Sequence, residues 1–291
     1  MTIAHQSGRT SGTPSIHFRR LGKDRGPERS RESLLPIFVV HGLSYFSYDW
    51  LGVGQALGAQ REVILMDMRG FGDSDWSPGR DYSVPAMAQD IVNVMDHAGW
   101  KRALLVGHSM GGRSTTYVAA KHPSRAAALA LVDYSPENAP AGSKRTATTV
   151  ANVPERFKDI EEAMRYFNSS DRARFEAYLK PLDGGYAIKR DPFFREQFKK
   201  LLETGERPKL GVDMWQLIGE VRCPILSMRG TRSDLYAPET AAKMKAANPR
   251  LEVAEVDAGH DIAGDNPQGF LETLGSFMKK MEGQAYEHAR H

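Results

Sequence analysis

The sequence predicts an α/β fold in which a mostly parallel central sheet has helices on both faces. Short apolar runs of strand length alternate along the chain with segments of helical periodicity. Strands that alternate with helices pair in parallel, because each helix returns the chain to the same end of the sheet. One long segment, 136–221, interrupts this alternation and is too long for an ordinary loop. We therefore expect a single α/β core that carries an inserted unit.

The first half of the chain supplies the first expected elements. Residues 1–14 are polar and small and are predicted to form a disordered tail, followed by an edge strand at 15–21. The continuous apolar run 35–40 is typical of a strand buried on both faces. A helix is expected at 48–59 and the next strand at 62–68. In 84–98, Met87, Ile91 and Val94 recur at helical spacing, and Gly99 ends the helix.

Later elements follow the same alternation. A strand at 102–107 leads into a helix at 112–121, which ends before Pro123. Further expected strands are 127–134, 224–229 and 251–256, and further expected helices are 237–247 and 267–281. Within the interrupting segment, 156–167, 171–179 and 193–202 are amphipathic and are predicted to be helical.

Composition restricts the class of protein. Hydrophobic residues make up 41% and charged residues 26% of the chain, as in ordinary globular enzymes, and a net charge of +3 is too small to indicate nucleic acid. No apolar run has the length of a membrane span, and 1–14 lacks the apolar centre of a signal peptide. The single cysteine, Cys223, fits a reducing compartment, so we expect a cytoplasmic location.

Binding motifs for metals and cofactors are missing from the sequence. It contains no Walker loop, no paired Cys-x-x-Cys, no His-Glu-x-x-His and no calcium loop, so we expect neither a metal nor a cofactor. The expected partner is a small-molecule substrate, with no nucleic acid and no membrane. The sequence leaves the oligomeric state open.

The most informative motif is Gly-x-Ser-x-Gly at 107–111, centred on Ser109. It lies between a predicted strand and a predicted helix, which is the context of a nucleophilic serine on a sharp turn. Side chains two residues before and after the serine would collide across such a turn, so glycine is needed at both positions. The motif therefore predicts that Ser109 is a nucleophile.

Four further segments, together with the serine motif, match the pattern of one known family in chain order. With the serine motif they are VVHGL at 39–43, DMRGFGDS at 67–74, GHSMG at 107–111, CPILSMRG at 223–230 and DAGH at 257–260. On these segments the chain resembles the α/β-hydrolases, from about residue 36 to residue 281. The resemblance implies an α/β-hydrolase core at 15–135 and 222–283, a helical cap at 136–221 over the active site, and a tail at 284–291.

The same resemblance implies a catalytic base and an acid. His260 lies where the family keeps its base, and histidine titrates near neutral pH. Two aspartates compete as the acid: Asp133, at the end of strand 127–134, and Asp234, after strand 224–229. The usual acid slot holds Ser233, so Asp234 is one residue late. The subgroup that includes acetamidomethylene-succinate hydrolase has serine in that slot and takes its acid from the earlier strand, which favours Asp133 and leaves Asp234 as the alternative.

The remaining site residues follow from position. By resemblance, the backbone N–H groups of Leu43 and Met110 are expected to stabilise an oxyanion. Arg113, four residues after the nucleophile, also matches the subgroup and is a candidate for binding a substrate carboxylate. Trp215 is a candidate for lining the substrate pocket. Structural salt bridges or packing are the competing roles for these two side chains.

A serine nucleophile in this family implies acyl transfer to water through a Ser-His-Asp triad and an acyl-enzyme. The expected activity is hydrolysis of a small-molecule carboxylic ester or amide. Hydrolysis of a carbon–carbon bond in β-diketone-like ring-cleavage products is the alternative. Two readings of another class stay open: a cofactor-free oxygenase or lyase, and a ligand receptor on the same fold.

Overall fold

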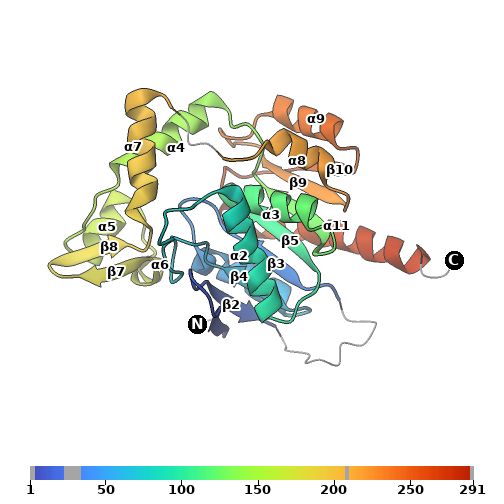
Figure 1. The fold of residues 1–291 in the computed structure, drawn as a ribbon, viewed down its shortest axis with the longest axis horizontal. Coiled ribbons are helices and arrows are strands. Elements are labelled where there is room, and N and C mark those ends of the chain that lie inside the picture. Colours follow the sequence, from blue (N-terminus) through green and yellow to red (C-terminus); the bar gives the residue numbers. More distant parts are fainter. Residues whose placement is uncertain (1–3, 23–33, 207–209, 289–291) are drawn as a thin grey trace.

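One eight-stranded sheet forms the centre of the computed structural model, which describes residues 4–22, 34–206 and 210–288 (Figure 1). The strand order is β1-β2-β4-β3-β5-β6-β9-β10, and all neighbours from β4 to β10 are parallel. The strands are β1 (Gln6–Arg9), β2 (His17–Leu21), β3 (Ile37–Val40), β4 (Val63–Met66), β5 (Ala103–His108), β6 (Ala126–Val132), β9 (Ile225–Gly230) and β10 (Leu251–Val256). The predicted fold class, a mostly parallel sheet with helices on both faces, is confirmed.

The first strand corrects the prediction for the N-terminus. β1 lies within 1–14, predicted as a disordered tail, and pairs antiparallel with β2 from Gln6 opposite Arg20 to Arg9 opposite His17. β1 is therefore the edge strand, and β2 lies between β1 and β4. The residues of β1 are polar and mostly exposed, so backbone pairing with β2 holds this strand in place. No hydrophobic pattern in the sequence predicts it. Residues 1–3 of the predicted tail lie outside the described residues.

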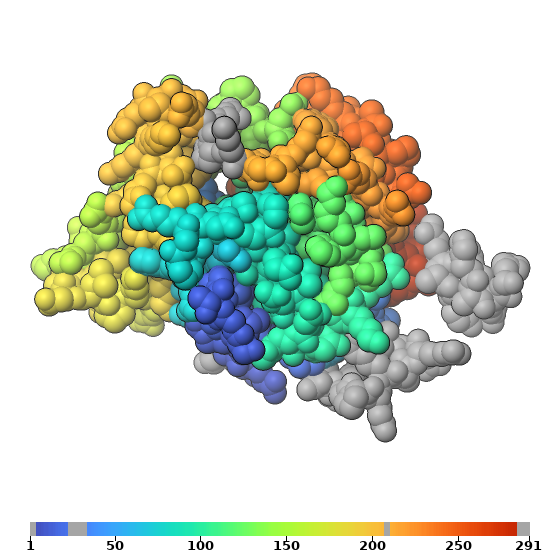
Figure 2. All heavy atoms as spheres, in the orientation of Figure 1, coloured from blue at the N-terminus to red at the C-terminus, as the bar shows by residue number. Residues whose placement is uncertain are grey.

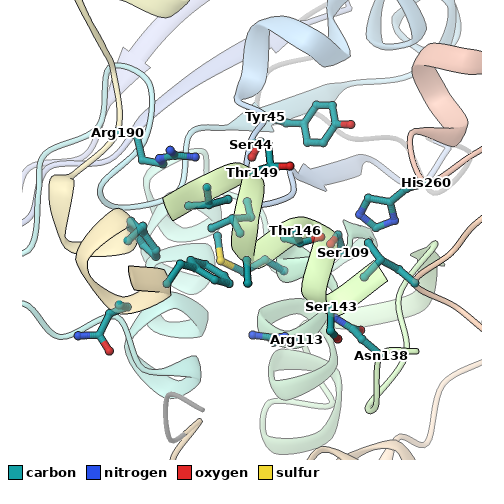
Figure 3. Close-up of a pocket in the computed structure, with 18 of the residues that line it drawn as sticks. Ser44, Tyr45, Ser109, Arg113, Asn138, Ser143, Thr146, Thr149, Arg190 and His260 are labelled. Atoms are coloured by element: carbon teal, nitrogen blue, oxygen red, sulfur yellow. The ribbon is translucent and has the colours of Figure 1, made fainter. Parts of the chain in front are cut away.

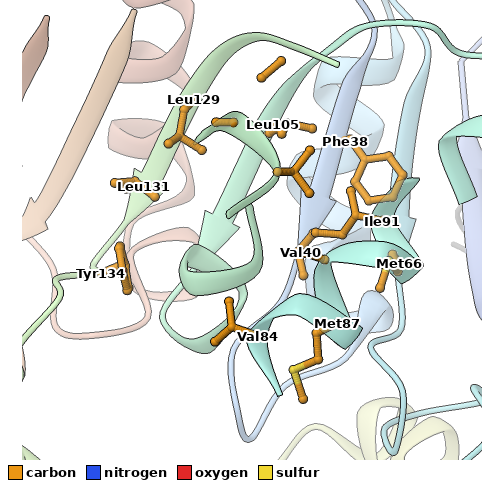
Figure 4. Close-up of a cluster of buried hydrophobic side chains, with 14 of the residues drawn as sticks. Phe38, Val40, Met66, Val84, Met87, Ile91, Leu105, Leu129, Leu131 and Tyr134 are labelled. Atoms are coloured by element: carbon orange, nitrogen blue, oxygen red, sulfur yellow. The ribbon is translucent and has the colours of Figure 1, made fainter. Parts of the chain in front are cut away.

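Helices cover both faces of the sheet. One face packs against α2 (Val84–His97), α3 (Met110–Lys121), α8 (Met214–Glu220) and α9 (Pro238–Ala247), and the other against α1 (Leu51–Gly58) and α11 (Pro267–His288). Figure 4 shows the first face, where Phe38 and Leu105 meet Ile91 of α2. Leu104 and Val106 face the opposite cluster, because side chains alternate along a strand.

The inserted segment has its own hydrophobic cluster, which includes Phe157, Phe175 and Ile188. Its elements are α4 (Pro140–Asn152), α5 (Ile160–Tyr166), α6 (Arg172–Tyr178), the hairpin β7 (Leu179–Leu182) and β8 (Gly185–Ile188), and α7 (Pro192–Thr204). We call α4 to α7, with this hairpin, the cap. In Figure 1 the cap lies beside the sheet, on the left.

The C-terminal limits of the cap and of the core differ from the prediction. α8 lies within 136–221 but packs on the core, where Met214, Leu217 and Ile218 join the cluster of α2, α3 and α9. The last helix continues to His288, although a tail was predicted from residue 284; residues 289–291 lie outside the described residues. No helix in the described part of the chain is both long and apolar enough to cross a membrane.

Candidate active site

Ser109 occupies a sharp turn between β5 and α3. Its backbone angles are φ 49° and ψ −115°, a conformation that costs a non-glycine residue roughly 1–3 kcal/mol. A Cβ atom on Gly107 would lie 2.2 Å from Thr115 Oγ1, and one on Gly111 would lie 2.4 Å from the Val40 carbonyl oxygen. Both positions therefore require glycine, for the steric reason that the motif predicts.

His260 forms a hydrogen-bonded pair with the buried Asp133. His260 Nδ1 lies 2.6 Å from Asp133 Oδ2, and the Asp133 side chain is fully buried. The carboxylate also accepts hydrogen bonds from the Gly230 N–H at 2.9 Å and the Ser233 hydroxyl at 2.5 Å. These two donors replace the water that the buried Asp133 carboxylate cannot reach. The carboxylate can therefore act as the counter-ion of a protonated His260.

Asp234 points to a different partner. Its two oxygens lie 2.6 Å from Nε and 2.7 Å from Nη2 of Arg145, on α4 of the cap, and the Asp234 side chain is 39% exposed. The hydrogen bond from Arg145 lowers the pKa of Asp234. The structure thus brings Asp133, and not Asp234, into hydrogen-bond contact with His260.

Ser109 and His260 line the same large cavity. It has a volume of about 1590 Å³ and is lined by Ser109, His260, Leu43, Met110 and Arg113, together with residues of the cap. Figure 3 shows the His260 ring next to Ser109 on one side of this cavity. The molecular surface is hollowed between α7 and the core helices (Figure 2). A substrate in the cavity would therefore meet core residues on one side and cap residues on the other.

The loop after β3 lies directly against Ser109. A Cβ atom on Gly42 would be 3.2 Å from the Ser109 Cβ. The buried His41 ring fixes this loop: its Nε2 accepts the Met68 N–H at 2.9 Å, so Nδ1 carries the proton and donates to the Gly42 carbonyl at 2.7 Å. Burial lowers the pKa of His41, which favours this neutral form.

The two residues expected to form the oxyanion hole flank this contact. Leu43 follows Gly42 in the loop, and Met110 is the first residue of α3. The N–H groups of a first helical turn have no acceptor within the helix, and the helix dipole favours negative charge there. This end of α3 therefore suits a developing oxyanion.

His108 contacts the backbone of His260. Its Nε2 lies 3.0 Å from the His260 carbonyl oxygen, and its ring packs edge-on against Tyr45 at a centroid distance of 5.0 Å. Burial and the nearby His260 hold the pKa of His108 well below its usual value. A neutral His108 can donate to that carbonyl without placing a positive charge beside His260.

The two predicted substrate-binding residues have different positions. Arg113 is half-buried and lines the cavity. Trp215 does not line it: the side chain lies on α8 and packs against the core cluster, so the prediction for Trp215 was wrong. The cavity wall also includes Arg190, which is 8% exposed and which sequence analysis did not identify. No motif in the sequence around Arg190 predicts a place in the cavity wall, because only the burial of this residue in the folded chain distinguishes it.

The cluster of His17, Asp67 and Asp73 brings possible metal-binding atoms within 4.8 Å of one another. Asp67 already accepts hydrogen bonds from His17 Nδ1 and from the N–H groups of Ser47 and Asp73. Burial acts to raise the pKa of Asp67, but His17 and these bonds hold it at about 2. The cluster therefore braces the loop after β4.

Comparisons with known proteins agree with this fold. A family model described as alpha/beta hydrolase fold matches residues 36–267. A 3-hydroxybutyrate-oligomer hydrolase of Cupriavidus necator is 29% identical, over 77% of this chain and 82% of the relative. A 2-(acetamidomethylene)succinate hydrolase of Mesorhizobium japonicum is 28% identical, over 83% of this chain and 87% of the relative. A crystal structure of E-2-(acetamidomethylene)succinate hydrolase, at 24% identity, superposes with a TM-score of 0.80 and covers 95% of this chain and 100% of that chain.

Proposed function

The chain belongs to the α/β-hydrolase family, and on this premise we propose that it hydrolyses a small-molecule carboxylic ester or amide through an acyl-enzyme on Ser109. The observation that carries the proposal is the 2.6 Å contact between His260 Nδ1 and the buried Asp133 carboxylate, beside a cavity that Ser109 also lines. A serine and a histidine at one cavity, with a buried carboxylate on the histidine, supply the groups that acyl transfer needs.

Acylation gives each of these groups a role. The Ser109 hydroxyl oxygen attacks the substrate carbonyl carbon while His260 Nε2 accepts the hydroxyl proton. The negative charge that develops on the carbonyl oxygen meets the N–H groups of Leu43 and Met110. Asp133 holds the proton on His260 Nδ1 and stabilises the imidazolium. His260 then gives its proton to the leaving alcohol or amine as the carbon–heteroatom bond breaks.

Deacylation repeats these steps with water. His260 Nε2 takes a proton from a water molecule, whose oxygen attacks the acyl carbonyl, and the same two N–H groups hold the second oxyanion. His260 then returns the proton to the Ser109 oxygen as the bond between this oxygen and the acyl carbon breaks, which releases the carboxylic acid product. The names of the two relatives reported above, both hydrolases, support water as the final acceptor.

The decisive experiment is covalent labelling. A p-nitrophenyl phosphonate is expected to label the protein once, on Ser109, because the phosphonyl group imitates the tetrahedral intermediate. Ser109→Ala is expected to remove the label and to lower kcat on ester and amide substrates by about 10³-fold or more, with an unchanged circular dichroism spectrum. Label on another residue, or full turnover by the alanine variant, would contradict the acyl-enzyme. Turnover of vinylogous β-diketones but of no ester or amide would favour carbon–carbon hydrolysis instead.

A further inference from the structure

Arg190 lies in the short cap segment between β8 and α7, which is fastened to the core. The Gly72 N–H donates to the Lys189 carbonyl at 2.8 Å, and the Asp191 N–H donates to the Gly70 carbonyl at 2.8 Å. These two backbone bonds join the cap to the loop after β4. They fix the position of Arg190 more firmly than a free loop would.

The charges on either side of Arg190 already have partners. Lys189 Nζ lies 2.7 Å from Asp73 Oδ1. The Asp191 carboxylate accepts the Tyr82 hydroxyl and the Phe193 N–H. Asp191 is therefore engaged with other groups and does not serve as the counter-ion of its neighbour.

Arg190 itself has no such partner. Its side chain lines the cavity, the residue is only 8% exposed, and Figure 3 shows the guanidinium pointing into the cavity. In the described ranges 4–22, 34–206 and 210–288, no acceptor lies within hydrogen-bonding distance of the guanidinium group. A buried and unpaired cation is unfavourable, because water no longer solvates it and no anion replaces the water.

Other arginines of the cavity show the contrast. Arg174 contacts Asp49 at 2.5 Å, Arg80 contacts Glu196 at 2.9 Å, and Arg145 is bidentate to Asp234. Each of these three is neutralised by a carboxylate of the protein. Arg190 keeps its charge available to the contents of the cavity.

We propose that Arg190 binds a carboxylate of the substrate, so that the hydrolysed ester or amide is an anionic compound with a carboxylate remote from its scissile carbonyl. The proposal rests on the proposed function, since it deepens the substrate class of the same site. A planar guanidinium matches a carboxylate with two parallel hydrogen bonds. Val84, Met87 and Phe194 supply apolar walls in the same cavity, which suit a hydrocarbon link between the two ends of the substrate.

Binding can be measured without turnover. In Ser109→Ala protein, titration calorimetry compares monomethyl esters of dicarboxylic acids, from succinate to suberate, with the dimethyl esters of the same acids. We expect the best-fitting monoester to bind at least about tenfold more tightly than its diester, and we expect Arg190→Met to abolish this preference. Arg190→Lys keeps the charge and loses the two-pronged geometry, so it should retain part of the preference.

Arg195→Met is the matched control. Arg195 belongs to the same cap region, pairs with Glu155 and does not line the cavity, so its removal takes one positive charge away without touching the site. We expect this variant to keep the full preference for the monoester. Equal affinity for both esters at every length, or a preference that Arg195→Met removes as strongly as Arg190→Met, would overturn the proposal.

Thermal unfolding separates binding from folding. Loss of an unpaired buried cation is expected to leave the Tm unchanged or to raise it, whereas loss of a structural arginine lowers it. The preferred monoester should raise the Tm of the Ser109→Ala protein and not that of its Arg190→Met derivative. Marked destabilisation by both Arg190→Met and Arg190→Lys would assign the residue to folding and overturn the proposal. Because the binding assay uses Ser109→Ala protein, a failure of phosphonate labelling would count against the acyl-enzyme alone.

Discussion

Two turns at the same edge of the sheet carry aspartates with opposite surroundings. Asp133, after β6, has a fully buried side chain and contacts His260, Gly230 and Ser233. Asp234, after β9, is 39% exposed and pairs with Arg145 of the cap. The same chemical group thus serves the histidine in one turn and connects cap to core in the other. The partner and the burial, and not the residue type, therefore decide what each carboxylate does.

The largest expected effect comes from Asp133→Asn. The amide preserves shape but loses the charge that compensates the imidazolium, a change that costs a serine protease about 10⁴-fold in kcat. Asp133 has φ 43°, a left-handed conformation that asparagine also tolerates, so the backbone should not change. Steady-state hydrolysis of a p-nitrophenyl ester, with circular dichroism as the control for folding, measures the effect. A loss of less than tenfold would remove Asp133 from the triad.

A smaller effect is expected from Ser233→Ala. The Ser233 hydroxyl donates to the Asp133 oxygen that also faces His260, and a hydrogen bond to a charged group contributes about 1.5–3 kcal/mol. Because the Gly230 N–H still supports the carboxylate, we expect only about a tenfold loss of kcat. Thr231→Ala on the same turn is the control, since its hydroxyl meets the exposed Asp257 at 3.4 Å, and it should change kcat less than about twofold. Equal losses in the two variants would show that the turn, and not this hydrogen bond, matters.

The smallest effect is expected at the other turn. Asp234→Asn should change kcat by less than about threefold, because its partner Arg145 belongs to the cap. A double-mutant cycle with Arg145→Met should give a coupling free energy of unfolding of at most about 1 kcal/mol, which falls as salt is added. Chemical denaturation of the four proteins measures this coupling. A loss of kcat as large as that of Asp133→Asn would return Asp234 to the role of the acid.

What the sequence could predict depended on local sterics. The turn at Ser109 was predictable because Gly107 and Gly111 are required by contacts with Thr115 and Val40, whatever the substrate. The choice between Asp133 and Asp234 was less certain, because it depends on a pairing between residues 145 and 234 that no local pattern encodes. Family resemblance favoured Asp133, the aspartate that contacts His260. Only the distances in the structure assign His260 to Asp133 and Arg145 to Asp234.

Other features could not be predicted for related reasons. α4 carries small and polar residues, and Gly142 packs against the Asp234 carbonyl, so the helix lacks a clear apolar period. Trp215 has the size of a pocket-lining residue, but α8 packs on the core and takes it away from the cavity. Arg190 belongs to no motif. It stands out because it is buried and because no carboxylate of the described residues pairs with it.

The hydrogen bond between Ser233 and Asp133 also limits how the position of the acid could be exchanged in this chain. By the family resemblance, Ser233 occupies the usual slot of the acid, so a single exchange, Ser233→Asp, is the shortest route between the two positions. Ser233 Oγ lies 2.5 Å from Asp133 Oδ2, however, so two carboxylates would share one buried site and repel each other. Losing Asp133 first would leave the histidine without a counter-ion. In either order of exchange, the intermediate would therefore lack a single buried carboxylate on His260, so the effects of the two substitutions are expected not to be additive.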